Sequence, residues 1–262
     1  MSSQLRSIIF FWVVLLDAIS SIVFLTVLQG WLPLGNTSHV RLITFEVSFI
    51  KSSNNKFEIL GDFSCDIEKN TVYKAYKLIE DYKNVKEFFK NYSVEIKKNI
   101  PEFAGLGGGS SNAATFLNMT NQYCDLNLSK DDLCKIAVKV GADVPFFIYE
   151  FDSANVRGIG EIVEKFHEEI LDIQTITPNI KCNTGEIFEI FRKDFYKQIS
   201  KEEAKKLFNM KSIDILKEFN IKEANDLYEP ALSIYPLLKE YEKENWFFSG
   251  SGSSFFKVNN GK

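Results

Sequence analysis

The chain has 262 residues, enough to bury a sizeable core and form one large domain or two smaller ones. Its 45% hydrophobic and 25% charged content is that of an ordinary globular protein, and a formal net charge of -4 gives no electrostatic case for nucleic acid binding. Four widely spaced cysteines and two histidines argue against a zinc site or a disulfide framework, and they fit a reducing cytoplasm.

Residues 1–43 are an atypical apolar segment. Between Ile8 and Leu28 the only polar residues are Asp17 and three hydroxyl side chains. The stretch is long enough to span a membrane, although a central aspartate costs about 2.5–3.5 kcal/mol on an insertion scale. Its β-branched and aromatic residues are equally typical of two buried strands. A signal peptide fits less well, because the apolar run is long and has no obvious cleavage motif.

Further along the chain, alternation predicts a half-buried strand over residues 45–49 and a short second strand over 57–60. Asn70 is placed to cap a helix with one apolar face. A shorter helical segment over 85–89 then leads into a strand over 93–97.

The remaining elements mix helices and strands without a strict βαβ rhythm. We expect one helix that reaches Met119, a second that begins at Ser129 and ends at Gly141, and a third capped by Ser200. Strands are expected over 153–156, 160–163 and 172–177, and a helical segment over 230–241. The apolar runs 246–248 and 255–258 are expected to form a hairpin or a strand–loop–helix. This order predicts an α+β fold in two lobes, 44–165 and 166–262.

The most informative stretch is the glycine loop AGLGGGSS of residues 104–111, between the strand over 93–97 and a helix. Glycine lets backbone amides approach a ligand closely, and the first turn of a helix attracts anions. No lysine follows Gly109, so this is not the common phosphate loop, and the spacing is not that of a dinucleotide fingerprint. A flexible turn with a serine N-cap is the alternative, but the flanking elements favour phosphate binding.

Asp143 is the candidate catalytic residue. It is expected just past a helix end, and Pro145 restricts Val144 to extended conformations. Apolar neighbours would hold its carboxylate rigid and partly desolvated, suited to accept or orient a hydroxyl proton. An ordinary turn aspartate is the alternative.

The loop SGSGSS of residues 249–254 is a third candidate. Its glycines permit tight turns, and its serine hydroxyls can donate to anionic groups. Alone it is typical of a hairpin turn. Together with the first glycine loop it could close over a phosphorylated substrate.

These segments carry a family resemblance. Residues 101–114, 141–147 and 248–255 resemble, in order, the three motifs of the galactokinase, homoserine, mevalonate and phosphomevalonate kinase (GHMP) superfamily, and residues 160–162 and 225–232 also match. The match is closest to the branch that phosphorylates 4-diphosphocytidyl-2-C-methyl-D-erythritol. The resemblance covers roughly residues 44–258. It implies a ribosomal-S5-like N-terminal lobe and a ferredoxin-like C-terminal lobe.

The resemblance implies a cytoplasmic kinase of isoprenoid precursor synthesis that uses ATP and Mg²⁺ to phosphorylate a hydroxyl, the 2-hydroxyl, of that small molecule. It places Asp143 as the catalytic residue that acts as a base or orients the hydroxyl, and it assigns no metal-ligating residue. The ATP-binding residues it implies are Pro101, Glu102, Phe103, Ala104, Gly105, Leu106, Gly107, Gly108, Gly109, Ser110 and Ser111. The substrate-loop residues it implies are Ser249, Gly250, Ser251 and Gly252.

The N-terminal part departs from the family. Its members open with a strand carrying Ala-Lys-Val/Ile-Asn, whose lysine assists catalysis, and then a Tyr-His pair that holds the cytosine. Here the first lysine is Lys51, and residues 1–42 match poorly, as a divergent start or an altered reading frame would explain. Two alternatives follow: another GHMP-type kinase, and a catalytically impaired nucleotide-binding protein held at a membrane by the apolar segment. We expect no nucleic acid partner and no membrane partner, and the oligomeric state is not indicated.

Overall fold

The structure is a computed structural model that describes residues 13–17, 21–25, 45–98, 102–197 and 199–259. It divides into two compact units, each discontinuous in sequence. Among the described residues, the first unit holds 45–98 and 107–150, and the second unit holds all the others. The lobe limits 44–165 and 166–262 follow the chain order of the family and stay a prediction.

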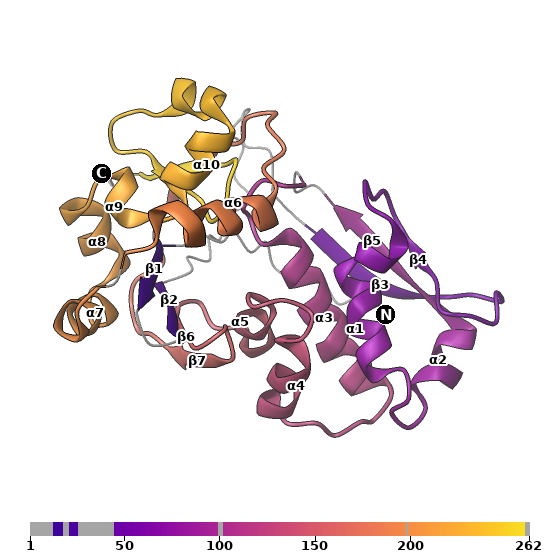
Figure 1. The fold of residues 1–262 in the computed structure, drawn as a ribbon. Coiled ribbons are helices and arrows are strands. Elements are labelled where there is room, and N and C mark those ends of the chain that lie inside the picture. The colour runs from indigo at the N-terminus through magenta and orange to yellow at the C-terminus, as the bar shows by residue number, and fades with distance from the viewer. Residues whose placement is uncertain (1–12, 18–20, 26–44, 99–101, 198, 260–262) are drawn as a thin grey trace. The chain divides into compact units, whose positions relative to one another are not determined.

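The first unit is built on one sheet with the strand order β3-β5-β4. Its strands are β3 (Phe45–Lys51), β4 (Ile59–Leu60) and β5 (Tyr92–Lys98). Strand β5 runs antiparallel to β3 and parallel to β4. Its helices are η1 (Ile67–Lys69), α1 (Thr71–Ile79), α2 (Val85–Asn91), α3 (Gly108–Tyr123), α4 (Lys130–Ala137) and α5 (Val144–Tyr149) (Figure 1).

Aromatic rings hold α3 against this sheet. Phe89 on α2 and Phe116 on α3 are fully buried, and their ring centroids lie 5.5 Å apart. Phe49 on β3 meets Phe89 edge-on at 5.3 Å, and Phe57 does so at 5.1 Å. Edge-to-face pairs of this kind add to the stabilisation from buried area. The core therefore fixes the helix that follows the glycine loop.

The helix starts predicted at Asn70 and Ser129 are confirmed, but one predicted helix end is wrong. The Asn70 side chain accepts a hydrogen bond from the Val72 amide at 2.9 Å, and Ser129 accepts from the Asp132 amide at 3.1 Å. Helix α4 ends at Ala137 and not at Gly141. A turn follows it, so the glycine comes after the turn.

The second unit contains two sheets, ordered β1-β2-β6-β7 and β8-β10-β9. Its strands are β1 (Val13–Asp17), β2 (Ser21–Leu25), β6 (Ala154–Arg157), β7 (Ile162–Lys165), β8 (Ile173–Ile176), β9 (Phe247–Phe248) and β10 (Phe255–Val258). Its helices are α6 (Thr184–Ile190), η2 (Phe191–Phe195), α7 (Lys201–Phe208), α8 (Ser212–Glu218), α9 (Ile221–Ala224), α10 (Tyr228–Ile234) and η3 (Pro236–Tyr241).

The expectations for residues 246–258 and 230–241 can now be compared with the structure. Strands β9 and β10 pair antiparallel, so the hairpin alternative holds. The helical segment expected over 230–241 is two elements, because α10 ends before Tyr235 and Pro236 then opens η3. A residue before proline is restricted to extended conformations, which explains the break.

The apolar stretch near the N-terminus forms strands where it is described. Strands β1 and β2 pair antiparallel from Val13↔Leu25 to Asp17↔Ser21. Strand β2 continues the sheet to β6 through Phe24↔Val156. The remaining positions of this stretch lie outside the described residues. In the part of the chain that the structure describes, none of the helices combines the length and the apolarity needed to cross a membrane.

Candidate functional site

The N-terminus of α3 is built by the second half of the glycine loop. Gly107 is the N-cap, with a left-handed φ of +67°, and no side chain caps the helix. The first helical hydrogen bond runs from the Ser111 amide to the Gly107 carbonyl at 2.9 Å. The preceding amides carry no bond within the helix, and the dipole of a 16-residue helix adds positive potential there. This end of α3 is suited to bind a phosphate.

The same helix start is tied to its neighbours. The Thr71 hydroxyl, at the start of α1, donates to the Gly109 carbonyl at 2.7 Å. The buried Ser111 hydroxyl donates to the Gly108 carbonyl at 3.0 Å. The serine N-cap of the alternative interpretation is therefore not formed, because a glycine occupies that position.

The first half of the glycine loop lies in the second unit, bonded to the loop of residues 249–254. The Ser254 amide donates to the Ala104 carbonyl at 3.0 Å, and the Ser249 hydroxyl donates to the Gly105 carbonyl at 2.8 Å. Gly105 has a φ of +67°, and a Cβ there would lie 2.1 Å from the Ser249 carbonyl oxygen. Only glycine fits this approach. The structure thus brings together residues 104–105 and 249–254. That the two loops close over a phosphorylated substrate stays a prediction, and Pro101 lies outside the described residues.

The serine hydroxyls of residues 249–254 bond within the protein. Ser251 shares a hydrogen bond with Thr184 at 2.7 Å, and Ser254 shares one with Thr177 at 2.8 Å. Ser253 donates to the Pro178 carbonyl at 3.1 Å. All four serines of the loop are buried. These hydroxyls therefore shape the loop, and the substrate-binding role of residues 249–252 stays a prediction.

Asn225 braces this loop. Its buried side-chain amide donates to the Phe248 carbonyl at 3.0 Å and to the Gly250 carbonyl at 2.9 Å. Removing this donor pair leaves two carbonyls short of partners in a buried site. The sequence matched Asn225 to the family but did not reveal this bracing role.

We expect Asn225→Ala to lower the free energy of unfolding by about 2–3 kcal/mol, because two buried carbonyls lose their donors. Denaturant unfolding followed by circular dichroism measures the change. Asn209→Ala is the matched control, since that exposed side chain also donates to a backbone carbonyl, of Lys205. Equal small losses in both variants would contradict the bracing role.

Asp143 is the N-cap residue of α5, and its side chain makes no capping hydrogen bond. The extended conformation expected at Val144 is wrong, because Val144 and Pro145 open a helix. Proline is favoured in the first turn of a helix, where its missing amide costs nothing. The apolar surroundings are as expected: Val144 to Ile148 are buried. The carboxyl group is therefore held by a packed helix and is not used to cap it.

Burial raises the pKa of the Asp143 carboxyl to about 7. Although the residue keeps some exposure, desolvation penalises the charged form, and no described cation pairs with it. A carboxyl that titrates near neutral pH is matched to accept a proton from a substrate hydroxyl.

Metal-ligating clusters and cysteine thiols are two further kinds of candidate site in the described residues. No group of three or more histidine, cysteine, aspartate or glutamate side chains is arranged there to hold a metal ion. All four cysteines are free, and burial raises the pKa of the Cys124 and Cys134 thiols to about 11 and that of Cys182 to about 12.

Comparison with known proteins gives consistent matches. The family model "GHMP kinases N terminal domain" matches residues 70–151. The 4-diphosphocytidyl-2-C-methyl-D-erythritol kinase of Sulfurimonas denitrificans is 47% identical over 220 residues, covering 81% of this chain and 83% of that protein. The enzyme of the same name from Sulfurovum sp. is 40% identical over 214 residues, covering 81% and 84%.

Solved structures match in fold. A 4-(cytidine 5'-diphospho)-2C-methyl-D-erythritol kinase has a TM-score of 0.67 at 22% identity, covering 100% of this chain and 91% of its own. A mevalonate pyrophosphate decarboxylase from Streptococcus pyogenes has a TM-score of 0.59 at 15% identity, covering 99% and 90%. The predicted α+β fold of the GHMP type is confirmed.

Proposed function

This chain belongs to the GHMP kinases, in the 4-diphosphocytidyl-2-C-methyl-D-erythritol kinase family, and we propose that it transfers the γ-phosphoryl group of ATP to the 2-hydroxyl of that substrate in the non-mevalonate isoprenoid pathway. Identity of 40–47% over about four fifths of the chain supports the substrate. The single observation that carries the chemistry is the desolvated Asp143 carboxyl, placed in the same unit as the phosphate-binding start of α3.

ATP binds through its phosphates to the start of α3. Phosphoryl transfer depends mainly on positioning and on stabilising charge, so a rigid set of backbone amides supplies much of what the reaction needs. The amides of residues 108–110 have no acceptor within the helix and can donate to phosphate oxygens. Mg²⁺, when bound with ATP, would supply positive charge to the phosphates.

Asp143 takes the proton of the attacking hydroxyl. With a pKa of about 7, a large fraction of the residue is ionised at neutral pH, and the ionised form accepts the proton as the oxygen attacks. The hydrogen bonds and burial of α5 keep the carboxyl in place without a capping bond. The base is therefore preorganised and available.

A second candidate function rests on a specific observation. The family's lysine is missing from the sequence before Lys51, and no described cation lies beside Asp143. A nucleotide-binding protein with weak or no transfer activity would have this arrangement. Such a protein would bind ATP through α3 but phosphorylate no alcohol at an appreciable rate.

A phosphoryl-transfer assay tests the proposal. Purified protein is incubated with Mg²⁺, γ-labelled ATP and 4-diphosphocytidyl-2-C-methyl-D-erythritol, with homoserine and mevalonate in parallel as other alcohols. We expect label in the first product only, and its rate of formation should fall at least about a hundredfold with the Asp143→Asn variant. Label in homoserine or mevalonate would favour another GHMP-type kinase. ATP binding without label in any alcohol would favour the second candidate.

The role of the glycine loop gives a further prediction. Gly108 is already helical, so Gly108→Val is compatible with the backbone but puts a branched side chain where phosphate should approach. We expect the ATP affinity to fall at least about tenfold, a loss of about 1.4 kcal/mol. Titration calorimetry measures it. Gly185→Val, at an exposed position in the first turn of α6, is the matched control. Unchanged ATP affinity in folded Gly108→Val protein would mean that the loop is only a turn.

A further inference from the structure

Helix α5 needs tertiary contacts to hold its position. It has only six residues, too few for a stable isolated helix. Asp143 precedes its first residue, so any shift or rotation of α5 moves the carboxyl. At the N-terminal end of α5, close to Asp143, the Cys134 thiol approaches the Pro145 carbonyl at 3.6 Å. The contacts at the C-terminal end of α5, the end far from Asp143, therefore also help to position the Asp143 carboxyl.

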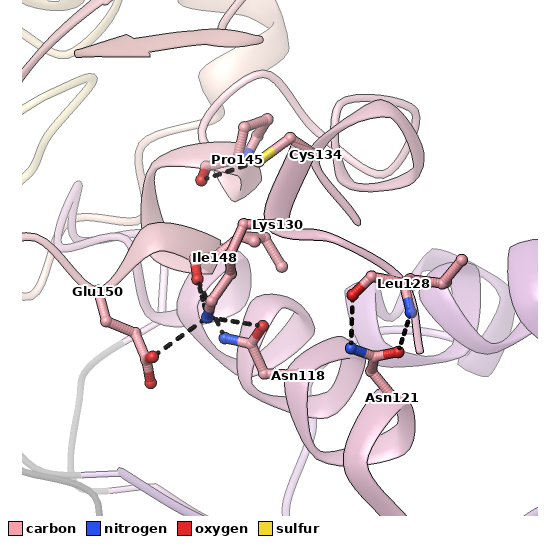
Figure 2. Close-up of polar contacts among 8 residues, drawn as sticks. All are labelled: Asn118, Asn121, Leu128, Lys130, Cys134, Pro145, Ile148 and Glu150. Atoms are coloured by element: carbon pink, nitrogen blue, oxygen red, sulfur yellow. Dashed lines mark hydrogen bonds and ion pairs between the residues drawn. The ribbon is translucent and has the colours of Figure 1, made fainter. Parts of the chain in front are cut away.

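Lys130, the first residue of α4, reaches that far end (Figure 2). Its ammonium donates to the Ile148 carbonyl at 2.5 Å and to the Asn118 side-chain oxygen at 3.2 Å. It also lies 3.2 Å from the Glu150 carboxylate. Asn118, on α3, donates its own amide to the same Ile148 carbonyl at 3.3 Å. One ammonium thus joins α3, α4 and α5.

The geometry of the helix end explains why a cation sits there. Glu150 follows α5 in a left-handed conformation, with a φ of +58°, and so ends the helix. The last carbonyls of a helix have no partner within it, and positive charge is favourable at that end. Lys130 and Glu150 are both substantially exposed, so their ion pair itself contributes little to stability. The contacts of the Lys130 ammonium with the Ile148 carbonyl and the Asn118 side chain, called the joint below, instead fix the position of α5 relative to α3.

We propose that Lys130 is a positioning residue that, through the Ile148 carbonyl and Asn118, fixes α5 against α3 and thereby places the Asp143 carboxyl for proton transfer. This inference rests on the proposed role of Asp143. The proposed role of Lys130 requires no contact with the substrate or with phosphate. Its effect reaches the reaction through the backbone of α5, whose other end carries the base. Small displacements of a catalytic group are enough to slow a reaction strongly.

The test replaces only the ammonium. Lys130→Met keeps the aliphatic stem, and Lys130→Arg keeps a cation with N–H donors. Lys135→Ala is the matched control, because Lys135 lies on the same helix but pairs with Asp132 at 2.8 Å. We expect Lys130→Met to lower kcat at least about fivefold, with KM for ATP within about twofold and the melting temperature within a few degrees. Lys130→Arg should recover most of kcat, and Lys135→Ala should keep it.

A double mutant decides whether the effect passes through Asp143. In the Asp143→Asn background, Lys130→Met should cause no further loss of kcat, because no base remains to be positioned. An equal loss in both backgrounds, or a rise in KM with kcat unchanged, would overturn the inference. If Asp143→Asn alone leaves turnover unchanged, the proposed function of Asp143 itself fails, which is a distinct result. Should Lys130→Met not fold, Asn118→Ala removes the same joint from α3, and the same comparison applies.

Discussion

Asp143→Asn is expected to lower turnover at least about a hundredfold, the usual scale for removing an acid–base group. Asparagine keeps the shape of the side chain but cannot take the hydroxyl proton. The parent enzyme should also lose kcat/KM as the pH falls below about 7, because the carboxyl becomes protonated and can no longer act as a base. A pH–rate profile of both proteins measures these effects.

The same variant is expected to melt at a higher temperature at pH 8. Burial raises the carboxyl pKa from 3.8 to about 7, so the folded state favours the protonated form. The stability that the folded protein has with a protonated Asp143 is fully present below about pH 4, and it is lost as the pH rises through about 7. Above that pH the buried charge costs up to about 4 kcal/mol, which asparagine avoids. The gain in melting temperature should therefore shrink to near zero at pH 4.

Turnover and melting temperature together distinguish a catalytic role of Asp143 from a structural one. A catalytic Asp143 gives lost turnover with gained stability at pH 8. An ordinary turn aspartate gives retained turnover, and a structural one gives earlier melting. Asp152→Asn is a suitable control, because that aspartate lies outside α5 and the proposed site. Retained turnover in the folded Asp143→Asn protein would remove Asp143 from the mechanism.

Local sequence signals predicted most of the elements correctly, and their failures have a physical cause. The capping residues Asn70, Ser129 and Ser200 each accept a backbone amide at a helix start, as their side chains predict. Proline was ambiguous, because it both restricts the residue before it and suits the first turn of a helix. At Pro145 the preference of proline for the first turn of a helix determines the conformation, because the residues around it are buried as one packed helix. That burial depends on distant parts of the chain.

The sequence proposes residue types for the candidate site, and it does not contain the contacts that the fold makes there. Glycines and serines indicate phosphate binding here because a predicted strand precedes them and a predicted helix follows them. The bond from Ser249 to Gly105 joins residues 144 positions apart, and no local pattern contains that information. The sequence matched Asn225 to the family and gave no sign of Lys130, and it shows for neither residue the carbonyls that the fold brings to its side chain.

Restoring the lysine of the family's first strand is the second large effect that we expect. The family's first strand carries a lysine, whereas residues 1–42 of this chain contain none. An opposite charge close to a carboxyl lowers its pKa and stabilises the ionised form, and a nearby cation also stabilises charge in phosphoryl transfer. Exchanging residues 1–42 for a first strand with the Ala-Lys-Val/Ile-Asn motif should therefore raise kcat about tenfold or more.

The control for this exchange is the same replacement with methionine at the lysine position. If the cation acts on Asp143, the lysine chimaera should exceed the methionine chimaera in kcat, and its kcat/KM should persist to a pH clearly below 7. The difference should disappear in the Asp143→Asn background, because the carboxyl through which the charge acts is gone. Equal activity of the two folded chimaeras would mean that another group in this chain already supplies the lysine's charge, or that transfer proceeds without it.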